Sequence, residues 1–382
     1  MQFRNLPKQY ETLKEQIDAA MMSVVASARF ISGPQVKELE KALAEYVGVK
    51  HCITCANGTD AITIAMRAWG VGKGDAVFVP DFTFFSSGEC PADEGATPIY
   101  VDVDQRTYNL DSMKLEEAVK KVIAEGKYKA KAVVAVDLFG LPADYPAIKA
   151  ICQKYGLLLL EDAAQGFGGS INGKMACSFG DISTTSFFPA KPLGCYGDGG
   201  AIFTSNDEWA DLIRSICIHG KNTGNPNDPN AKYNNIRIGK NSRLDTLQAA
   251  ILLPKFKAFV DYELADVNKV ANWYTEGLKD TDLVLPVVAE GFYSSWAQYT
   301  VQLPAYVDRK ELQAKLKAAD IPSMVYYTKP MHHQGAFAGT DSSVADCPVT
   351  EHLCSTVLSL PLDPYKTKED VDFIVSELKR AL

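Results

Sequence analysis

Between residues 50 and 205, short runs of apolar and β-branched residues alternate with segments whose apolar residues recur at helical spacing. The short runs predict strands at His51–Cys55, Ala76–Val79, Thr97–Val101, Ala132–Val136, Leu157–Leu160, Ile182–Phe187 and Gly200–Thr204. The helical patterns between them include Asp60–Trp69, Ser112–Ala124 and Ala143–Lys154. Apolar strands separated by helices are typical of a mostly parallel sheet covered on both faces. The pattern therefore predicts an α/β fold with ligands at the carboxyl ends of the strands.

The pattern changes on either side of this region. Before it, Ser32-Gly-Pro-Gln35 predicts a capping box, with the proline in the first turn of a helix at Val36–Tyr46. After it, a helical pattern runs from Arg243 to about Leu278, and Pro254 within it predicts a kink or a break. The polar segment Lys221–Lys232 has turn composition throughout, so we expect a mobile loop there.

The C-terminal third predicts a second, smaller unit. Its expected elements are a strand at Ala297–Leu303, a helix at Arg309–Ala319, a strand at Ser323–Tyr326 and a terminal helix at Lys368–Leu382. With 382 residues the chain is long enough for two domains. We expect a large domain with N-terminal helices over residues 1–250 and a small α+β domain over 251–382.

Composition narrows the function classes. A formal net charge of −8 argues against nucleic acid or an anionic membrane as the main partner, because either needs a dense basic surface. No run approaches the roughly 18 apolar residues of a membrane-spanning helix, and the N-terminus has no secretory pattern, so we expect a cytoplasmic protein. The nine cysteines are scattered, as reduced core thiols are, and Cys52-Ile-Thr-Cys55 lacks the second pair that a zinc site needs. We expect no metal site.

Two motifs carry the chemistry. The apolar run Leu157–Leu160 leads into Glu161-Asp-Ala-Ala-Gln165, and Lys191 follows Asp162 by 29 residues in the setting Ser186-Phe-Phe-Pro-Ala-Lys191. An acid at the exit of a buried strand, followed by a lysine among small residues, suits pyridoxal 5′-phosphate (PLP). The lysine would hold this cofactor as a Schiff base, and the carboxylate would keep the pyridine nitrogen protonated.

A third motif offers a phosphate site. Asn57-Gly58-Thr59-Asp60 follows a predicted strand and opens a helix, so its backbone amides and the helix dipole would face an anion. The Ser186 hydroxyl can reach the same group. No Gly-x-Gly-x-x-Gly follows a strand and no Walker lysine motif is present, which argues against NAD and ATP. Taken alone, the motif is equally well a helix cap.

Together these motifs resemble the DegT/DnrJ/EryC1/StrS family of nucleotide-sugar aminotransferases, which have PLP fold type I, the aspartate-aminotransferase architecture. The resemblance spans nearly the whole chain. It rests on Gly33-Pro, Asn57-Gly-Thr-Asp-Ala61, Pro80-Asp-Phe-Thr-Phe84, Glu161–Gln165, Ser186–Gly200, Asn241–Ile251 and Leu358-Ser-Leu-Pro361.

The resemblance implies a role for each motif residue. Lys191 and Asp162 are the implied catalytic residues, and Gln165 lies at the phenolic oxygen of the cofactor. The remaining implied contacts are Phe84 stacked on the ring, Gly58, Thr59 and Ser186 on the phosphate, and Asn241 on that phosphate from a second subunit. The resemblance thus implies a homodimer with shared active sites.

Within the family, Asn241–Leu252 and Ser294–Thr300 are most like enzymes that aminate a 3-keto sugar, in particular UDP-linked 2-acetamido-3-keto-glucuronate. Arg243 would then clamp the substrate carboxylate as a bidentate pair; the alternative is a structural ion pair with a neighbour such as Asp245. Tyr326 and Tyr327 would contact the sugar or the partner's cofactor. Two positions depart from the pattern, since Tyr326 and Asp137 stand where many relatives have histidine.

These implications define the expected activity. Glutamate gives its amino group to the cofactor and leaves as 2-oxoglutarate, and a keto nucleotide-sugar then takes the amino group, for cell-surface polysaccharide biosynthesis. Two alternatives stay open: amination of a 4-keto sugar, and a non-catalytic PLP-binding regulatory protein. The intact lysine and aspartate argue against the second alternative.

Overall fold

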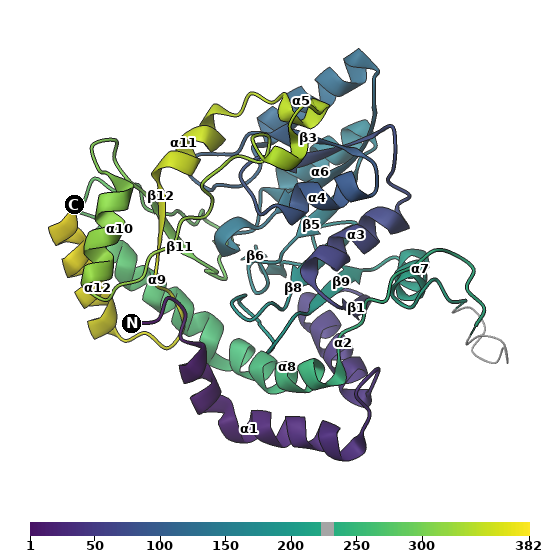
Figure 1. Cartoon of the computed structure of the whole chain (residues 1–382), viewed down its shortest axis with the longest axis horizontal. Coiled ribbons are helices and arrows are strands. Elements are labelled where there is room, and N and C mark those ends of the chain that lie inside the picture. The colour runs from purple at the N-terminus through teal and green to yellow at the C-terminus, as the bar shows by residue number, and fades with distance from the viewer. Residues whose placement is uncertain (223–232) are drawn as a thin grey trace.

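The structure is a computed structural model of the whole chain, and it describes residues 1–222 and 233–382 (Figure 1). The expected loop at Lys221–Lys232 falls almost wholly on residues 223–232, which lie outside the described residues.

The seven strands expected from the sequence form one sheet in the order β1-β9-β8-β5-β4-β2-β3. β2, β3, β4, β5 and β8 run parallel to one another, and β9 is antiparallel to both of its neighbours. The mostly parallel α/β fold is therefore confirmed. The bounds are β1 His51–Cys55, β2 Asp75–Pro80, β3 Thr97–Val101, β4 Lys129–Val136, β5 Leu158–Asp162, β8 Ile182–Ser186 and β9 Gly200–Thr204.

Helices cover both faces of this sheet because its strands are apolar on both sides. Residues of α3, α4 and α7 pack into one hydrophobic cluster, and residues of α2, α5, α6 and α8 pack into the clusters of the opposite face. Cys52 and Cys55 point into different clusters, since residues three apart in a strand face opposite sides. The bounds are α3 Gly58–Ala68, α4 Ser86–Asp93, α5 Ser112–Glu125, α6 Tyr145–Tyr155 and α7 Asp207–Cys217.

The entry to α2 (Pro34–Val47) differs from the expected capping box. The N-cap is Gly33, and no side chain caps the helix, although Pro34 does lie in its first turn. Close packing against Thr246 explains the glycine at the N-cap. The Gly33 N–H donates to Thr246 Oγ1 at 3.0 Å, and a Cβ at Gly33 would lie 2.5 Å from Thr246 Cγ2. The close approach requires glycine at this position.

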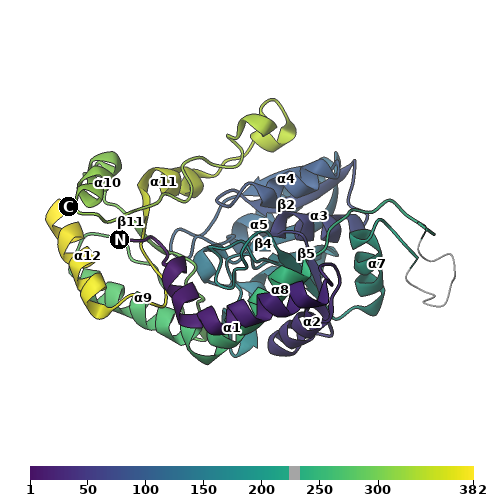
Figure 2. The same cartoon turned by 60° about the horizontal axis from the view of Figure 1, so that its bottom comes forward.

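The long helical pattern after Arg243 is broken later than expected. α8 (Thr246–Ala258) continues through Pro254, and a π-helical turn at Phe259–Glu263 then leads into α9 (Leu264–Leu278). The predicted break at Pro254 is therefore wrong. α8 packs against both α1 (Leu6–Ser27) and α2, and this tertiary support carries the helix past its proline (Figure 2).

The C-terminal elements pack around a separate hydrophobic cluster formed by α9, α10 and α12 with the antiparallel pair β11 and β12. The expected strand at Ser323–Tyr326 is wrong: only Met324 forms an isolated bridge there, to Ser359 of the unexpected strand β12. The bounds are β11 Tyr299–Gln302, α10 Arg309–Ala318, α11 Pro348–Thr356, β12 Val357–Leu360 and α12 Lys368–Ala381.

Short elements complete the described chain. A small antiparallel sheet joins β6 (Ser170–Ile171), β7 (Lys174–Met175) and β10 (Phe292–Tyr293), and 3-10 turns lie at Leu138–Gly140, Gly335–Phe337 and Asp341–Ser343. Across residues 1–222 and 233–382, no helix combines the length and the apolar character that a membrane crossing requires.

Candidate active site

A cavity of about 690 Å³ opens at the carboxyl ends of the parallel strands. Asp162 ends β5, Ser186 ends β8, and the segments after β1 and β2 supply further walls. Nine of the eleven predicted site residues line this cavity: Gly58, Thr59, Phe84, Asp162, Gln165, Ser186, Lys191, Tyr326 and Tyr327. The structure thus brings together residues that lie between positions 58 and 327 of the sequence.

One end of the cavity is the N-terminus of α3. Asn57 is its N-cap, and Asn57 Oδ1 accepts a hydrogen bond from the Asp60 N–H at 2.7 Å. A Cβ at Gly58 would lie 2.8 Å from Ser186 Cβ, so only glycine lets the turn approach β8 this closely. The free amides of the first helical turn and the Ser186 hydroxyl form a cradle suited to an anion.

Asp162 places a carboxylate in the floor of the cavity, where it is only 5% exposed. Its oxygens accept from the Ala164 N–H at 3.1 Å and from Ser87 Oγ at 3.3 Å. Burial raises the pKa of Asp162, and the Ala164 amide, Lys191 and Ser87 oppose that rise. A positively charged ligand nitrogen beside this carboxylate would favour its ionised form.

Lys191 lies in the turn after β8 and points its amine into the same cavity. Loss of water on burial lowers the pKa of Lys191, while the nearby Asp162 charge acts to raise it. The Lys191 N–H donates to the Phe188 carbonyl at 2.9 Å, and Arg4 Nη2 donates to the Pro192 carbonyl at 3.4 Å. A lowered pKa favours the neutral amine, which is the nucleophilic form of lysine.

Gln165 and Tyr327 join the floor to the opposite wall. Gln165 Oε1 accepts from the Phe139 N–H at 2.8 Å, and Gln165 Nε2 donates to Tyr327 Oη at 3.1 Å. Within residues 1–222 and 233–382 no other hydrogen bond uses the second hydrogen of Gln165 Nε2, so it is available to a ligand. Burial raises the pKa of Tyr327, so its hydroxyl keeps its proton at neutral pH. Phe84 is 54% exposed, and its ring centroid lies 6.5 Å from that of Tyr327.

Asn241 and Arg243 do not line this cavity. They precede α8 on another part of the surface, where Arg243 borders a separate hollow of about 540 Å³. Arg243 Nη2 donates to Asn241 Oδ1 at 2.7 Å. Within the described parts of the chain no ion pair joins Arg243 to Asp245.

Several cavity residues escaped the sequence analysis. Lys329, Met331 and Gln334 line the wall opposite the α3 cradle, and they belong to a segment with neither helix nor strand. That segment has no periodicity and no motif that would single them out. Gln298, Phe188 and Asp198 also line the cavity.

Two buried acids next to the site, Glu161 and Asp137, accept hydrogen bonds from neighbouring segments of the chain. Glu161 accepts hydrogen bonds from the Cys177, Phe179 and Gly180 amides and from Ser183 Oγ, at 2.6 to 3.2 Å. Asp137 accepts from Tyr145 Oη at 2.7 Å and from the Ala143 N–H at 3.1 Å. Burial and the charge of Glu161 raise the pKa of Asp137.

Comparison with known proteins defines the class of this protein. The model of the DegT/DnrJ/EryC1/StrS aminotransferase family matches residues 11–379. The chain is 45% identical to the UDP-2-acetamido-2-deoxy-3-oxo-D-glucuronate aminotransferase of Pseudomonas aeruginosa, over 99% of both proteins. It is 39% identical to the UDP-N-acetyl-3-dehydro-alpha-D-glucosamine 3-aminotransferase of Acidithiobacillus ferrooxidans, over 99% of this chain and 97% of that protein.

A solved structure agrees with this assignment. The crystal structure of a DegT DnrJ EryC1 StrS aminotransferase from Brucella abortus superimposes with a TM-score of 0.94 at 45% identity, covering 100% of this chain and 99% of that one. The chain belongs to the DegT/DnrJ/EryC1/StrS aminotransferase family. It is a PLP-dependent aminotransferase of PLP fold type I, as the sequence predicts.

The residues of the cavity fit PLP. The cradle at Gly58 and Ser186 leaves no room for a side chain but exposes amide and hydroxyl donors, as a phosphate requires. Asp162 offers a buried carboxylate to a pyridine nitrogen, and Lys191 offers an amine with a lowered pKa on the same cavity.

Proposed function

We propose that this aminotransferase moves the amino group of glutamate to a UDP-linked 2-acetamido-3-keto-glucuronate or a similar 3-keto sugar, for cell-surface polysaccharide biosynthesis. The observation that carries this proposal is the 45% identity, over 99% of both chains, to an enzyme named for that keto-glucuronate. The relative named for a 3-keto glucosamine, 39% identical, supports amination at the sugar's third carbon. One cavity of about 690 Å³ would accept both substrates in turn.

Lys191 and Asp162 are the proposed catalytic residues. PLP, when bound, supplies an electron sink for the electrons left on the amino acid's α-carbon as a proton departs. Lys191 would hold the resting cofactor and then, as a free amine, accept that α-proton at Nζ. Its lowered pKa supports this role, because a base must be unprotonated to accept a proton. Asp162 would keep the ring nitrogen protonated.

The other cavity residues would bind and orient. Gly58, Thr59 and Ser186 would hold the phosphate with amide and hydroxyl donors. Phe84 would cover one face of the ring, and Gln165 would donate its remaining hydrogen to the phenolic oxygen. Tyr326 and Tyr327 would contact the sugar, and their place on the wall of the cavity supports this assignment.

Asn241 and Arg243 would serve the cavity of a second copy of the chain. Both lie off their own cavity, so they can reach a cofactor or sugar only in another subunit. Asn241 would donate to the phosphate, and Arg243 would clamp the sugar carboxylate. We therefore propose a homodimer whose sites each need both chains.

The test of a shared site mixes two inactive variants, Lys191→Ala and Asn241→Ala. After subunit exchange, each hybrid dimer holds one site with neither lesion, so about a quarter of wild-type activity should return. No recovery after mass spectrometry has verified the exchange would mean that each site is built from one chain.

The substrate is tested with purified protein and PLP. Glutamate alone should convert the cofactor to its amino form, which is followed by its absorbance. The UDP-linked 3-keto-glucuronate should then restore the original absorbance faster than the UDP-linked 3-keto N-acetylglucosamine or a 4-keto sugar does. Faster reaction with the 3-keto N-acetylglucosamine would contradict the glucuronate assignment, and faster reaction with the 4-keto sugar would contradict the 3-keto class.

We also propose a division into a large domain at 1–250 and a small domain at 251–382, supported by the separate hydrophobic cluster between Val267 and Leu378.

A cytoplasmic location is proposed because all nine cysteines are buried and unpaired, which suits a reducing compartment.

A further inference from the structure

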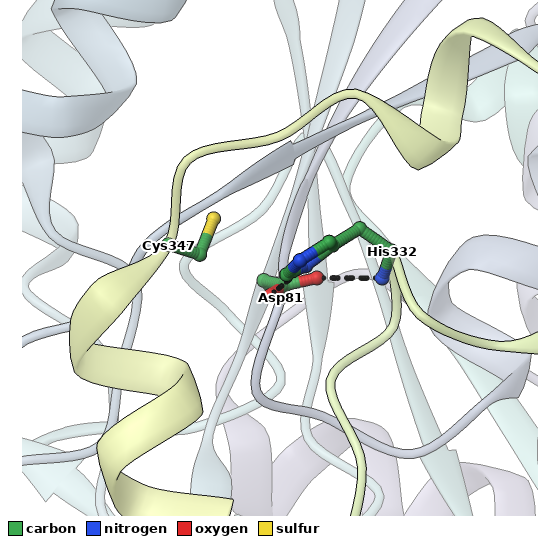
Figure 3. Close-up of side chains that lie close together, drawn as sticks. All are labelled: Asp81, His332 and Cys347. Carbon is green, nitrogen blue, oxygen red and sulfur yellow. Dashed lines mark hydrogen bonds and ion pairs between the residues drawn. The ribbon is translucent and has the colours of Figure 1, made fainter.

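Asp81 and His332 form a buried pair on one side of the cavity (Figure 3). Asp81 directly follows β2 and is 1% exposed, while His332 lies in the segment after Tyr327 and is 4% exposed. His332 Nδ1 lies 2.6 Å from Asp81 Oδ2, and the His332 N–H donates to Asp81 Oδ1 at 2.9 Å. The Met331 N–H donates to the Asp81 carbonyl at 3.1 Å. One residue thus accepts hydrogen bonds through both side-chain oxygens and its backbone.

Cys347 lies beside this pair, and its sulfur falls within 4.8 Å of the ligand atoms of Asp81 and His332 (Figure 3). The distances nevertheless describe a hydrogen bond. Two ligands of a tetrahedral zinc ion lie roughly 3.3 Å apart, because each is about 2.0–2.1 Å from the metal. At 2.6 Å, Nδ1 and Asp81 Oδ2 share a hydrogen bond, which occupies Nδ1 whichever of the two atoms donates and leaves it no lone pair for a metal.

The pair joins two segments that both line the cavity. Thr83, Phe84 and Phe85, which line the cavity, follow Asp81 in the chain. Tyr327, Lys329, Met331 and Gln334, which also line the cavity, surround His332 in sequence. The two segments are 251 residues apart along the chain and share no strand ladder. Their relative position therefore depends on a few side-chain contacts.

The pair supplies a short, directional hydrogen bond among those contacts. The aromatic contacts between the two segments are the Tyr327 ring with Phe82 at 5.9 Å and with Phe84 at 6.5 Å, and the Phe85 ring with Phe337 at 5.7 Å, all between ring centroids. A hydrogen bond to a buried carboxylate is short and directional, and it is costly to leave unmade. The pair therefore fixes the spacing that the aromatic rings alone leave adjustable.

We propose that Asp81 and His332 are positioning residues that hold Phe84 over the cofactor ring, in a fixed position relative to Tyr327 and Lys329 on the wall of the cavity. This proposal rests on the ring-stacking role proposed for Phe84 and is independent of which sugar reacts. Neither residue lines the cavity, so each acts through its neighbours.

The test compares three variants of the PLP-loaded enzyme. His332→Leu removes the donor, His332→Asn retains one because an asparagine Nδ2 can stand where Nδ1 stood, and His333→Leu alters the exposed neighbour as a control. The readouts are bound PLP per chain, the visible circular dichroism of bound PLP, and the glutamate half-reaction rate per bound PLP. Using glutamate alone separates this test from the identity of the sugar.

His332→Leu should keep stoichiometric PLP, because the proposed phosphate donors lie on α3 and β8. It should lose most of the visible circular dichroism and slow the half-reaction about ten- to a hundredfold, as a displaced wall does. The half-reaction rate of His332→Asn should stay within about threefold of the wild-type rate. His333→Leu should have the wild-type rate and circular dichroism.

Three results would overturn the proposal. One is an unchanged rate and unchanged circular dichroism per bound PLP in His332→Leu, with only the melting temperature lowered, because this is what a purely structural pair gives. Another is an equal loss in His332→Asn and His332→Leu. The third is stoichiometric zinc in the purified protein.

If His332→Leu does not fold, the double variant Asp81→Leu/His332→Leu serves instead, because it removes both partners and leaves no buried charge unpaired. It should show the same loss of visible circular dichroism. A wild-type signal would contradict the proposal.

Discussion

The two sides of the cavity are built differently. On one side, the cradle at α3, Asp162 and Ser186 stand at the ends of elements of a single sheet. On the other side, the walls are the segment after β2 and the segment around Tyr327, which have no regular structure of their own. A rigid sheet holds atoms to the tolerance that catalysis needs, whereas loops accept sequence change. We infer that the first side sets the chemistry and the second the substrate.

The packing of each side supports this division. On the sheet side, added side chains have no room: a Cβ at Gly58 or at Gly200 would lie 2.8 or 2.6 Å from its neighbours. On the loop side, Phe84 is half-exposed and its ring centroid lies 6.5 Å from that of Tyr327. Substitutions on the sheet side should therefore abolish activity, and substitutions on the loop side should redirect or slow it.

The largest effect is expected for Lys191→Ala on the sheet side. The variant loses its base and its covalent link to the cofactor, and a positioned base alone contributes about 10²- to 10⁴-fold. It should still bind the amino form of PLP, because the proposed phosphate and ring contacts lie elsewhere. Steady-state turnover and bound cofactor are measured together. More than a tenth of wild-type activity would exclude Lys191 as the catalytic lysine.

The next effect concerns Asp162→Asn. The amide cannot hold the ring nitrogen protonated, so the variant should keep its cofactor yet slow both half-reactions, by about a hundredfold or more. Stopped-flow absorbance with glutamate, and separately with the keto-sugar, measures this. A normal glutamate half-reaction would remove Asp162 from the site.

The sheet side is also the part that the sequence predicts well. Continuous apolar runs bounded by turns mark the strands, and the glycines, acid and lysine of the site follow those runs directly. Predictions fail where packing overrides local pattern, as at Pro254, where α1 and α2 support the helix, and at Gly33, where Thr246 leaves no room for a side chain. β12 follows α11 without a turn, so no signal separates the two elements.

The loop side resists prediction for a physical reason. His332 meets Asp81 across 251 residues of sequence, and neither residue lies in a periodic pattern. Lys329 and Gln334 line the cavity in the segment that this contact joins to the end of β2. A family resemblance predicts Tyr326 and Tyr327, whereas the pair behind them becomes visible only in the folded chain.

Arg243→Lys tests the contact that we assign to a second subunit. Lysine keeps the charge but loses the bidentate fork, and a hydrogen bond to a charged group contributes roughly 1.5–3 kcal/mol. The KM for the keto-glucuronate should rise about tenfold or more, while the glutamate half-reaction stays unchanged. Arg214→Lys is the control, since Arg214 borders the same hollow but pairs with Glu40 at 3.2 Å. Equal losses in both half-reactions would point to a carboxylate site shared by both substrates.

The smallest effect concerns a buried lysine outside the cavity. Lys255 of α8 is 1% exposed, and its Nζ lies 4.8 Å from the centroid of the Tyr196 ring. Burial lowers the pKa of Lys255 to about 8, against the opposing charge of Glu263, which precedes the small-domain helix α9. Between pH 8 and about 10.5, the ordinary pKa, the unfolded chain therefore binds more protons at this position than the folded chain does. The contribution of Lys255 to the free energy of unfolding must rise with pH across that window, by at most about 1.4 kcal/mol per pH unit.

The rise of the Lys255 contribution with pH can be measured by comparing wild type with Lys255→Met. The difference in melting temperature, wild type minus variant, should grow in favour of wild type from pH 8 to pH 10, because the variant lacks the titrating amine. Lys257→Met is the matched control on the same helix, since Lys257 is exposed and pairs with Asp261, and its difference from wild type should stay nearly flat. A flat difference for Lys255→Met as well would mean that Glu263 and the Tyr196 ring keep the amine protonated as firmly in the folded protein as water does in the unfolded chain. Lys255 would then stay charged in the folded protein, and its contribution to the free energy of unfolding would not vary with pH in this range.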